Sequence, residues 1–137
     1  MIDVNTLMRG NIIETKDGII EIGKIHRESV GDKWGAIYFD DEIEGIEVTE
    51  DMLDKIGFKK DSCGDFYTFW TYWGEEYRYK LEVSYGCNSD RKLSLHVDND
   101  VCNSIGAGEF TYLHELQNLT RVISGFDLKI IKNMLYD

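Results

Sequence analysis

The stretch TYLHELQNLTRVISG, from Thr111 to Gly125, decides the fold because its apolar residues recur at helical spacing. The apolar stripe of this predicted helix contains Tyr112, Leu116, Leu119, Val122 and Ile123, with Leu113 at its margin. Thr111 is placed to cap the start of the helix, and Gly125 to adopt the left-handed conformation after its end. A single amphipathic helix needs a sheet to pack on, so the rest of the chain is expected to supply strands.

Alternating apolar and polar residues predict those strands. The alternation is clearest in residues 77–85 and 91–97, where every second side chain is apolar and Ser84 is expected on the outer face. Further strands are predicted at residues 12–15, 19–26, 36–39 and 66–73, the first two joined as a hairpin by Lys16-Asp17-Gly18. Residues 28–35 and 98–110 are expected to be loops, the second around a short strand at Val101, while residues 126–135 fit a strand or a helix.

A short inner helix is predicted between Thr49, which is a suitable N-cap, and Gly57, which is a suitable C-cap. The length of 137 residues favours one core, so we expect a single domain over residues 1–137. The predicted fold class is therefore α+β. It combines a mainly antiparallel curled sheet, open or barrel-like, with one long C-terminal helix and the short inner helix.

The charge of the chain limits its partners. Twenty-six acidic against fifteen basic residues give a net charge of −11, which opposes binding to nucleic acid or to an anionic membrane surface. The start, MIDVNTLMRG, lacks the apolar core of a signal peptide, and no apolar run is long enough for a membrane span. We therefore expect a cytoplasmic protein that contacts neither nucleic acid nor membrane directly.

Catalytic and metal-binding motifs are incomplete. His114-Glu115 begins like the zinc motif H-E-x-x-H, but Asn118 stands where the second histidine is needed, and His114 is expected to be a partly exposed helix residue. The three cysteines form no C-x-x-C pair, and no phosphate loop or nucleophile elbow occurs. We expect no catalytic residue, no metal, no cofactor and no enzymatic activity.

An acidic run follows the first predicted strands. Its candidate partner-binding residues are Asp40, Asp41, Glu42, Glu44, Glu47 and Asp51. A row of carboxylates would suit a basic protein surface, and the overall charge would speed the association. The alternative is a solvated loop and helix start, because Glu50 and Asp51 would lie in the first turn of the inner helix.

An aromatic strand at residues 66–73 lies beside several cations. The candidate ligand-binding residues are Trp70, Tyr72, Trp73, Arg78, Lys80, Arg91 and Lys92. Rings stack on nucleobases and cations hold phosphates, so a small nucleotide is one candidate ligand. The alternative is that the two apolar faces of this strand pack against the core and against a helix or a second copy of the chain, giving a homo-oligomer.

Three stretches resemble a family of small uncharacterised proteins of gut bacteria, their prophages and other mobile elements. They are LMRGN at residues 7–11, VTEDML with KIGF at residues 48–58, and YLHELQNL with Ser124-Gly125 at residues 112–125. Glu115 stands where that family has a glutamine, and Thr120 where an aromatic residue is commoner. The resemblance implies a phage or mobile-element setting, in which small acidic proteins often bind and disable host machinery.

Together these observations favour a non-catalytic binding protein, such as a counter-defence factor that inhibits a host protein through an acidic surface. The alternatives are sequestration of a nucleotide-type ligand and a structural role as an oligomer.

Overall fold

The computed structural model describes residues 2–61, 69–73, 79–85, 92–99, 104–125, 127–128, 130 and 132–135. In this part of the chain, ten strands form two five-stranded antiparallel sheets. The strands are β1 (Ile12–Thr15), β2 (Gly18–Ile25), β3 (Ser29–Asp32), β4 (Ile37–Phe39), β5 (Ile43–Glu44), β6 (Lys59–Asp61), β7 (Phe69–Trp73), β8 (Tyr79–Tyr85), β9 (Leu93–Asn99) and β10 (Ser104–Phe110). The helices are α1 (Glu50–Ile56) and α2 (Leu113–Ser124), with 3-10 turns η1 (Val4–Thr6), η2 (Asp40–Glu42) and η3 (Lys132–Leu135). The predicted α+β class is confirmed.

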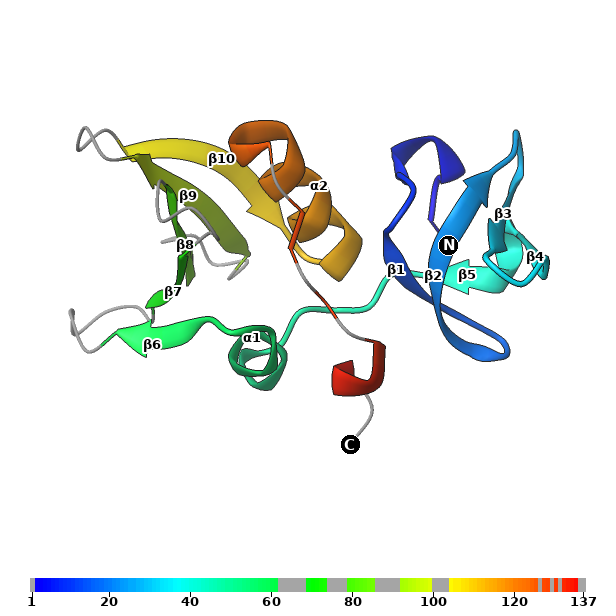
Figure 1. The fold of residues 1–137 in the computed structure, drawn as a ribbon, viewed down its shortest axis with the longest axis horizontal. Coiled ribbons are helices and arrows are strands. Elements are labelled where there is room, and N and C mark those ends of the chain that lie inside the picture. The colour runs from blue at the N-terminus through cyan, green and yellow to red at the C-terminus, as the bar shows by residue number, and fades with distance from the viewer. Residues whose placement is uncertain are drawn as a thin grey trace.

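The strands divide between two sheets rather than forming the single sheet expected. The first sheet has the order β4-β3-β2-β1-β5 and the second the order β10-β9-β8-β7-β6. In the first sheet the two edge strands, β4 and β5, are joined only by η2, which requires the sheet to curl. Neither sheet closes into a barrel, so the barrel-like option is wrong. Helix α2 lies between the two sheets (Figure 1).

The predicted N-terminal hairpin is present as β1 and β2. Thr15 Oγ1 accepts a hydrogen bond from the backbone N–H of Asp17 and donates one to the carbonyl of Gly18, at 3.1 and 2.9 Å. Ile13 lies opposite Ile20, and both are buried. The core of the first sheet consists of Ile2, Val4, Leu7, Ile13, Ile20, Ile22, Val30, Tyr38 and Ile43.

Helix α1 follows the local signals of the sequence. The Thr49 hydroxyl accepts a hydrogen bond from the N–H of Met52 at 3.2 Å, and Gly57 ends the helix at φ 119°. The N–H of Phe58 then donates to the carbonyl of Leu53 at 2.9 Å, which folds the fully buried Phe58 ring back onto the helix. The predicted inner helix is therefore confirmed at both ends.

Helix α2 differs from its prediction in its cap and in its buried face. Its N-cap is Tyr112 rather than Thr111, and the Glu115 carboxylate accepts the N–H groups of both residues, at 3.0 and 3.2 Å. The centre of the buried face is Leu113 and Leu116, whereas Tyr112 and Val122 are 41% and 75% exposed. Leu113, Leu116 and Thr120 follow one another at helical spacing, and this row meets the core. Gly125 ends the helix at φ 79°, as predicted.

The second core lies against α2 and was partly predictable. Leu81, Val83 and Leu95 are fully buried, in agreement with the alternation of β8 and β9. Ser84, expected on the outer face, is buried as well. The buried members of this core are Ile12, Val48, Leu53, Ile56, Phe58, Leu81, Val83, Leu93, Leu95, Val97, Phe110, Leu113, Leu116 and Leu128.

Two segments expected to be loops contain strands. Residues 28–35 include β3, where small residues lie between β2 and β4. Residues 98–110 include the end of β9 and all of β10, whose sequence SIGAGEF hides the alternation because glycines interrupt it. The register shifts between Gly106 and Gly108, which is a bulge of the kind that glycine permits, and Gly108 has φ 139°. Val101 lies outside the described residues. For residues 126–135, η3 is the one regular element in the described part.

Candidate functional site

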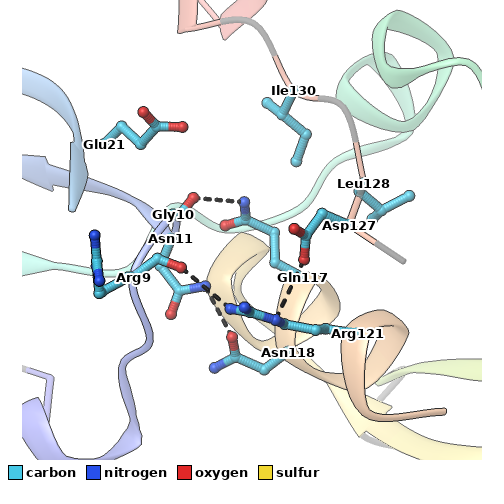
Figure 2. A pocket seen from close by; sticks show the side chains of 10 residues that line it. All are labelled: Arg9, Gly10, Asn11, Glu21, Gln117, Asn118, Arg121, Asp127, Leu128 and Ile130. Atoms are coloured by element: carbon cyan, nitrogen blue, oxygen red, sulfur yellow. Dashed lines mark hydrogen bonds and ion pairs between the residues drawn. The ribbon is translucent and has the colours of Figure 1, made fainter. Parts of the chain in front are cut away.

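Two distant stretches of the chain meet through side-chain amides. Gln117 on α2 accepts the N–H of Ile12 through Oε1 at 2.9 Å and donates from Nε2 to the carbonyl of Gly10 at 3.1 Å. Asn11 donates to Oδ1 of Asn118 at 2.8 Å (Figure 2). We call Gly10, Asn11, Gln117 and Asn118 the amide junction. It fixes the loop before β1 onto α2, and therefore the first sheet onto the helix that carries the second core.

The amide junction joins two of the stretches on which the family resemblance depends. Arg9-Gly10-Asn11 and Gln117-Asn118 are more than 100 positions apart in sequence, yet the hydrogen bonds above connect them directly. Gln117 and Asn118 lie off the apolar stripe of the predicted helix, so helical periodicity indicates no role for them. A signal that could have identified the amide junction is that Asn11 lies in one of the three stretches quoted for the resemblance, and Gln117 and Asn118 in another.

A polar cavity of about 110 Å³ lies beside the amide junction. Besides the junction, its lining includes Arg9, Glu21, Arg121, Asp127 and Ile130. Arg121 is engaged, because its Nη1 donates to the carbonyl of Arg9 and its Nε pairs with Asp127 Oδ1, both at 3.4 Å. Figure 2 shows the Glu21 carboxylate directed from β2 toward this cavity, opposite Ile130.

A larger hollow of about 310 Å³ adjoins this cavity, and the two share Glu21 and Ile130. It lies along β2, so we call it the β2 groove. Its lining consists of Ile12, Ile20, Glu21, Asp32, Lys33, Trp34, Ile130 and Asn133. The β2 groove therefore combines an apolar floor with charged side chains and one indole.

The predicted acidic run is divided by the fold. Asp40 and Asp41 are exposed in η2 at the end of β4. Glu42 has a structural role, since it pairs with Lys16 at 2.5 Å and accepts the N–H of Phe39 at 3.2 Å. The hydrogen bond from Lys16, followed by that from the backbone, lowers the pKa of the Glu42 carboxyl below its ordinary value. Glu42 therefore forms an intramolecular ion pair with Lys16 and caps the start of η2.

The remaining acidic candidates lie along the connection from the first sheet to α1. Glu44 on β5 is exposed and lies opposite Glu14 of β1. Glu47 is exposed and pairs with Tyr112 in an isolated bridge, and Asp51 is exposed in the first turn of α1. Figure 1 shows β5 and α1 well separated, with a long connection between them. These acids do not form one continuous row.

An apolar surface that the sequence analysis did not predict lies next to Asp40. Trp34, in the turn before β4, is 82% exposed, and Ile37 and Phe39 on β4 are 54% and 55% exposed. Tyr38 between them is buried, so Ile37 and Phe39 share the outward face of this edge strand. We call Trp34, Ile37 and Phe39 the β4 patch. The strand itself was predictable, but the side that faces solvent was not.

The predicted aromatic and basic site stays a prediction. Trp70, Tyr72 and Trp73 belong to β7 and Lys80 to β8, but the structure describes only their backbone. Arg78 and Arg91 lie outside the described residues. Lys92 is exposed just before β9.

His114 is buried, contrary to the partly exposed position expected. It is 3% exposed, and its Nδ1 atom has no hydrogen-bond partner in the described structure. The reason is the shifted buried face of α2, which turns His114 inward beside Leu113. Among the residues that the structure describes, no three histidine, cysteine or acidic side chains are placed to hold a metal ion.

The stability of the fold is expected to fall as the pH drops below about 6.5, the ordinary pKa of histidine. Burial lowers the pKa of His114, and the charge of Glu115 opposes this only in part. The unfolded chain therefore binds the proton more tightly, so the stability is complete above the unfolded pKa and is lost as the pH falls toward the folded pKa. A tenfold weaker proton affinity in the folded state corresponds to about 1.4 kcal/mol.

Urea unfolding at pH values between 8 and 5.5 measures this dependence. His114→Phe should flatten it, because phenylalanine fills the site without a proton to bind. His26→Gln, a change at an exposed histidine, serves as the control and should keep the slope of the original protein. If His114→Phe kept the same dependence of stability on pH, His114 would not be the cause of the loss.

The comparisons with known proteins identified no relative of this chain. No family model matches the sequence, and searches of curated proteins and of solved structures found no match. No helix in the described part of the chain is both long and apolar enough to cross a membrane.

Proposed function

We propose that this protein is a non-catalytic binding protein that attaches to a basic surface of a host protein. The observation that carries the proposal is the β4 patch, in which Trp34, Ile37 and Phe39 are exposed and Phe39 directly precedes Asp40 and Asp41. Large exposed apolar side chains that lie together usually mark an interaction site. Aromatic anchors with a charged rim are typical of the centre of a protein interface.

Electrostatics favours a basic partner. The net charge of −11 attracts positively charged proteins at long range and speeds their association. Asp40 and Asp41 would meet the basic groups of such a partner at the rim of the β4 patch. The apolar side chains would then exclude water from the centre of the contact.

The family resemblance suggests the biological setting of this interaction. It implies a phage or a mobile element in a bacterial cytoplasm, where a small acidic protein that occupies a host protein would act as a counter-defence factor.

Replacing the β4 patch should abolish the interaction. In affinity capture from a lysate of the host bacterium, the variant with Ile37→Ser and Phe39→Ser should lose a protein that the original chain retains. Asp40→Lys with Asp41→Lys should lose it too, because like charges then repel. The interaction should be reproduced with the purified partner and should weaken as salt is added.

Matched controls separate this surface from general effects of the substitutions. Val122→Ser removes an exposed apolar side chain on α2, and Glu109→Lys reverses an exposed charge on β10. Both controls should retain the partner. Equal capture by the patch variants and the controls would refute the proposal, and so would a stable homodimer through the β4 patch in light scattering.

A further inference from the structure

The β2 groove has the dimensions and floor of a side-chain pocket. Its volume of about 310 Å³ is at the lower end of the range for small-ligand sites. Ile12, Ile20 and Ile130 provide an apolar surface along it. Ile12 and Ile20 are buried and Ile130 is half-buried, so an extended aliphatic chain laid on this floor would mainly bury its own apolar surface, which is favourable at about 25 cal/mol per Å².

Glu21 supplies a charged end to this apolar surface. It lines both the β2 groove and the cavity beside the amide junction, and its carboxylate has no partner among the described residues. Asp32 also lines the groove, but its Oδ1 accepts the N–H groups of Trp34 and Ala36, each at 2.9 Å. Asp32 keeps only Oδ2 for a ligand, whereas Glu21 offers both of its oxygens to an incoming bidentate donor.

Trp34 connects the β2 groove with the β4 patch, since it belongs to both. The Lys33 ammonium lies 5.1 Å from the centre of its ring, within the range of a cation–π contact. The ring is nonetheless 82% exposed, so most of its surface remains accessible to a second planar or cationic group.

We infer that the β2 groove receives an arginine side chain of the basic partner. This inference rests on the proposed function and names the contact that gives it specificity. The aliphatic stem would lie on the isoleucines, the guanidinium would pair with Glu21 through two parallel hydrogen bonds, and its plane would stack on Trp34. Two carboxylates, Glu21 and Asp32, line the groove against one ammonium, that of Lys33, and together with the net charge of −11 they favour a cationic group over a phosphate or carboxylate ligand.

A short peptide tests the groove independently of the partner. Blocked Gly-Arg-Gly should cause saturable chemical-shift changes in the NMR spectrum at the amides of Glu21, Lys33 and Trp34. Its isostere with neutral citrulline should bind at least about tenfold more weakly, which is a difference of 1.4 kcal/mol. Glu21→Gln should weaken the binding of Gly-Arg-Gly to a similar extent. Glu14→Gln, a change at an exposed carboxylate of β1, should leave this binding unchanged.

The two proposals can fail separately. Three results would overturn the groove assignment. They are equal chemical-shift changes with the citrulline peptide, an unchanged affinity of Glu21→Gln for Gly-Arg-Gly, and saturable binding of AMP instead of the arginine peptide. The proposed function would survive that result if the patch variants still lost the protein partner. If the peptide binds as expected but no protein is lost from the patch variants, the groove assignment stands and the proposed function fails.

Discussion

Replacing Gln117 by alanine is expected to lower the free energy of unfolding by about 2–4 kcal/mol. The change removes the acceptor for the N–H of Ile12 and the donor for the carbonyl of Gly10. Ile12 is 1% exposed, so its N–H would lose its acceptor in a largely buried position, and an unsatisfied buried group costs about 1–3 kcal/mol. The loss should exceed that of a surface substitution because it loosens the first sheet from α2.

Urea unfolding followed by circular dichroism measures this loss. Gln117→Glu should fall between the original protein and Gln117→Ala, because its carboxylate keeps the acceptor for Ile12 and loses the donor for Gly10. Asn5→Ala, at an exposed position, should change the stability by less than about 0.5 kcal/mol. A stability of Gln117→Ala within that same margin would show that the amide junction does not hold the sheets together.

Replacing Gly45 by valine is expected to cost about 2–3 kcal/mol, near the upper end of the range for overpacking. A Cβ atom at position 45 would lie 2.6 Å from Cγ and 3.0 Å from Cβ of Tyr112. Both atoms are near the backbone, so the Tyr112 side chain cannot avoid the contact by a small rotation of its outer atoms. Tyr112 is the N-cap of α2, and Ile46 accepts the N–H of Leu113 at 2.8 Å, so the start of the helix must shift.

A double-mutant cycle identifies the cause. With Tyr112→Ala already present, Gly45→Val should cost about 1 kcal/mol or less, because the ring that it meets is gone. The coupling free energy measured by urea unfolding should therefore be larger than 1 kcal/mol in magnitude. Additive effects of the two substitutions would mean that the close approach of Gly45 to Tyr112 does not limit the packing.

Local signals predicted the parts of the fold that local geometry controls. Thr49 and Gly57 marked the ends of α1, and Gly125 the end of α2, because capping depends on neighbouring residues only. The inward residues of β8 and β9 also followed from the alternation. β10 was missed because Gly106 and Gly108 remove the side chains that would have shown its alternation.

The candidate sites were less predictable, since each depends on segments that are distant in sequence. The acidic run was identified, but the pairing of Glu42 with Lys16 and its contact with Phe39 set Glu42 apart from exposed Asp40 and Asp41. The β4 patch and the β2 groove were not expected. An alternating strand has two equivalent faces until a core covers one of them.

The sequence by itself determined the α+β class, both caps of α1, the C-cap of α2 and the acidic character of the surface. These properties come from composition and from residues a few positions apart. Only the tertiary structure decided that two sheets flank α2, that Gln117 and Asn118 hold Gly10 and Asn11, and that Glu21 faces a groove beside Trp34. The physical reason is that burial and hydrogen bonding between distant segments depend on how the sheets pack, which no short-range pattern encodes.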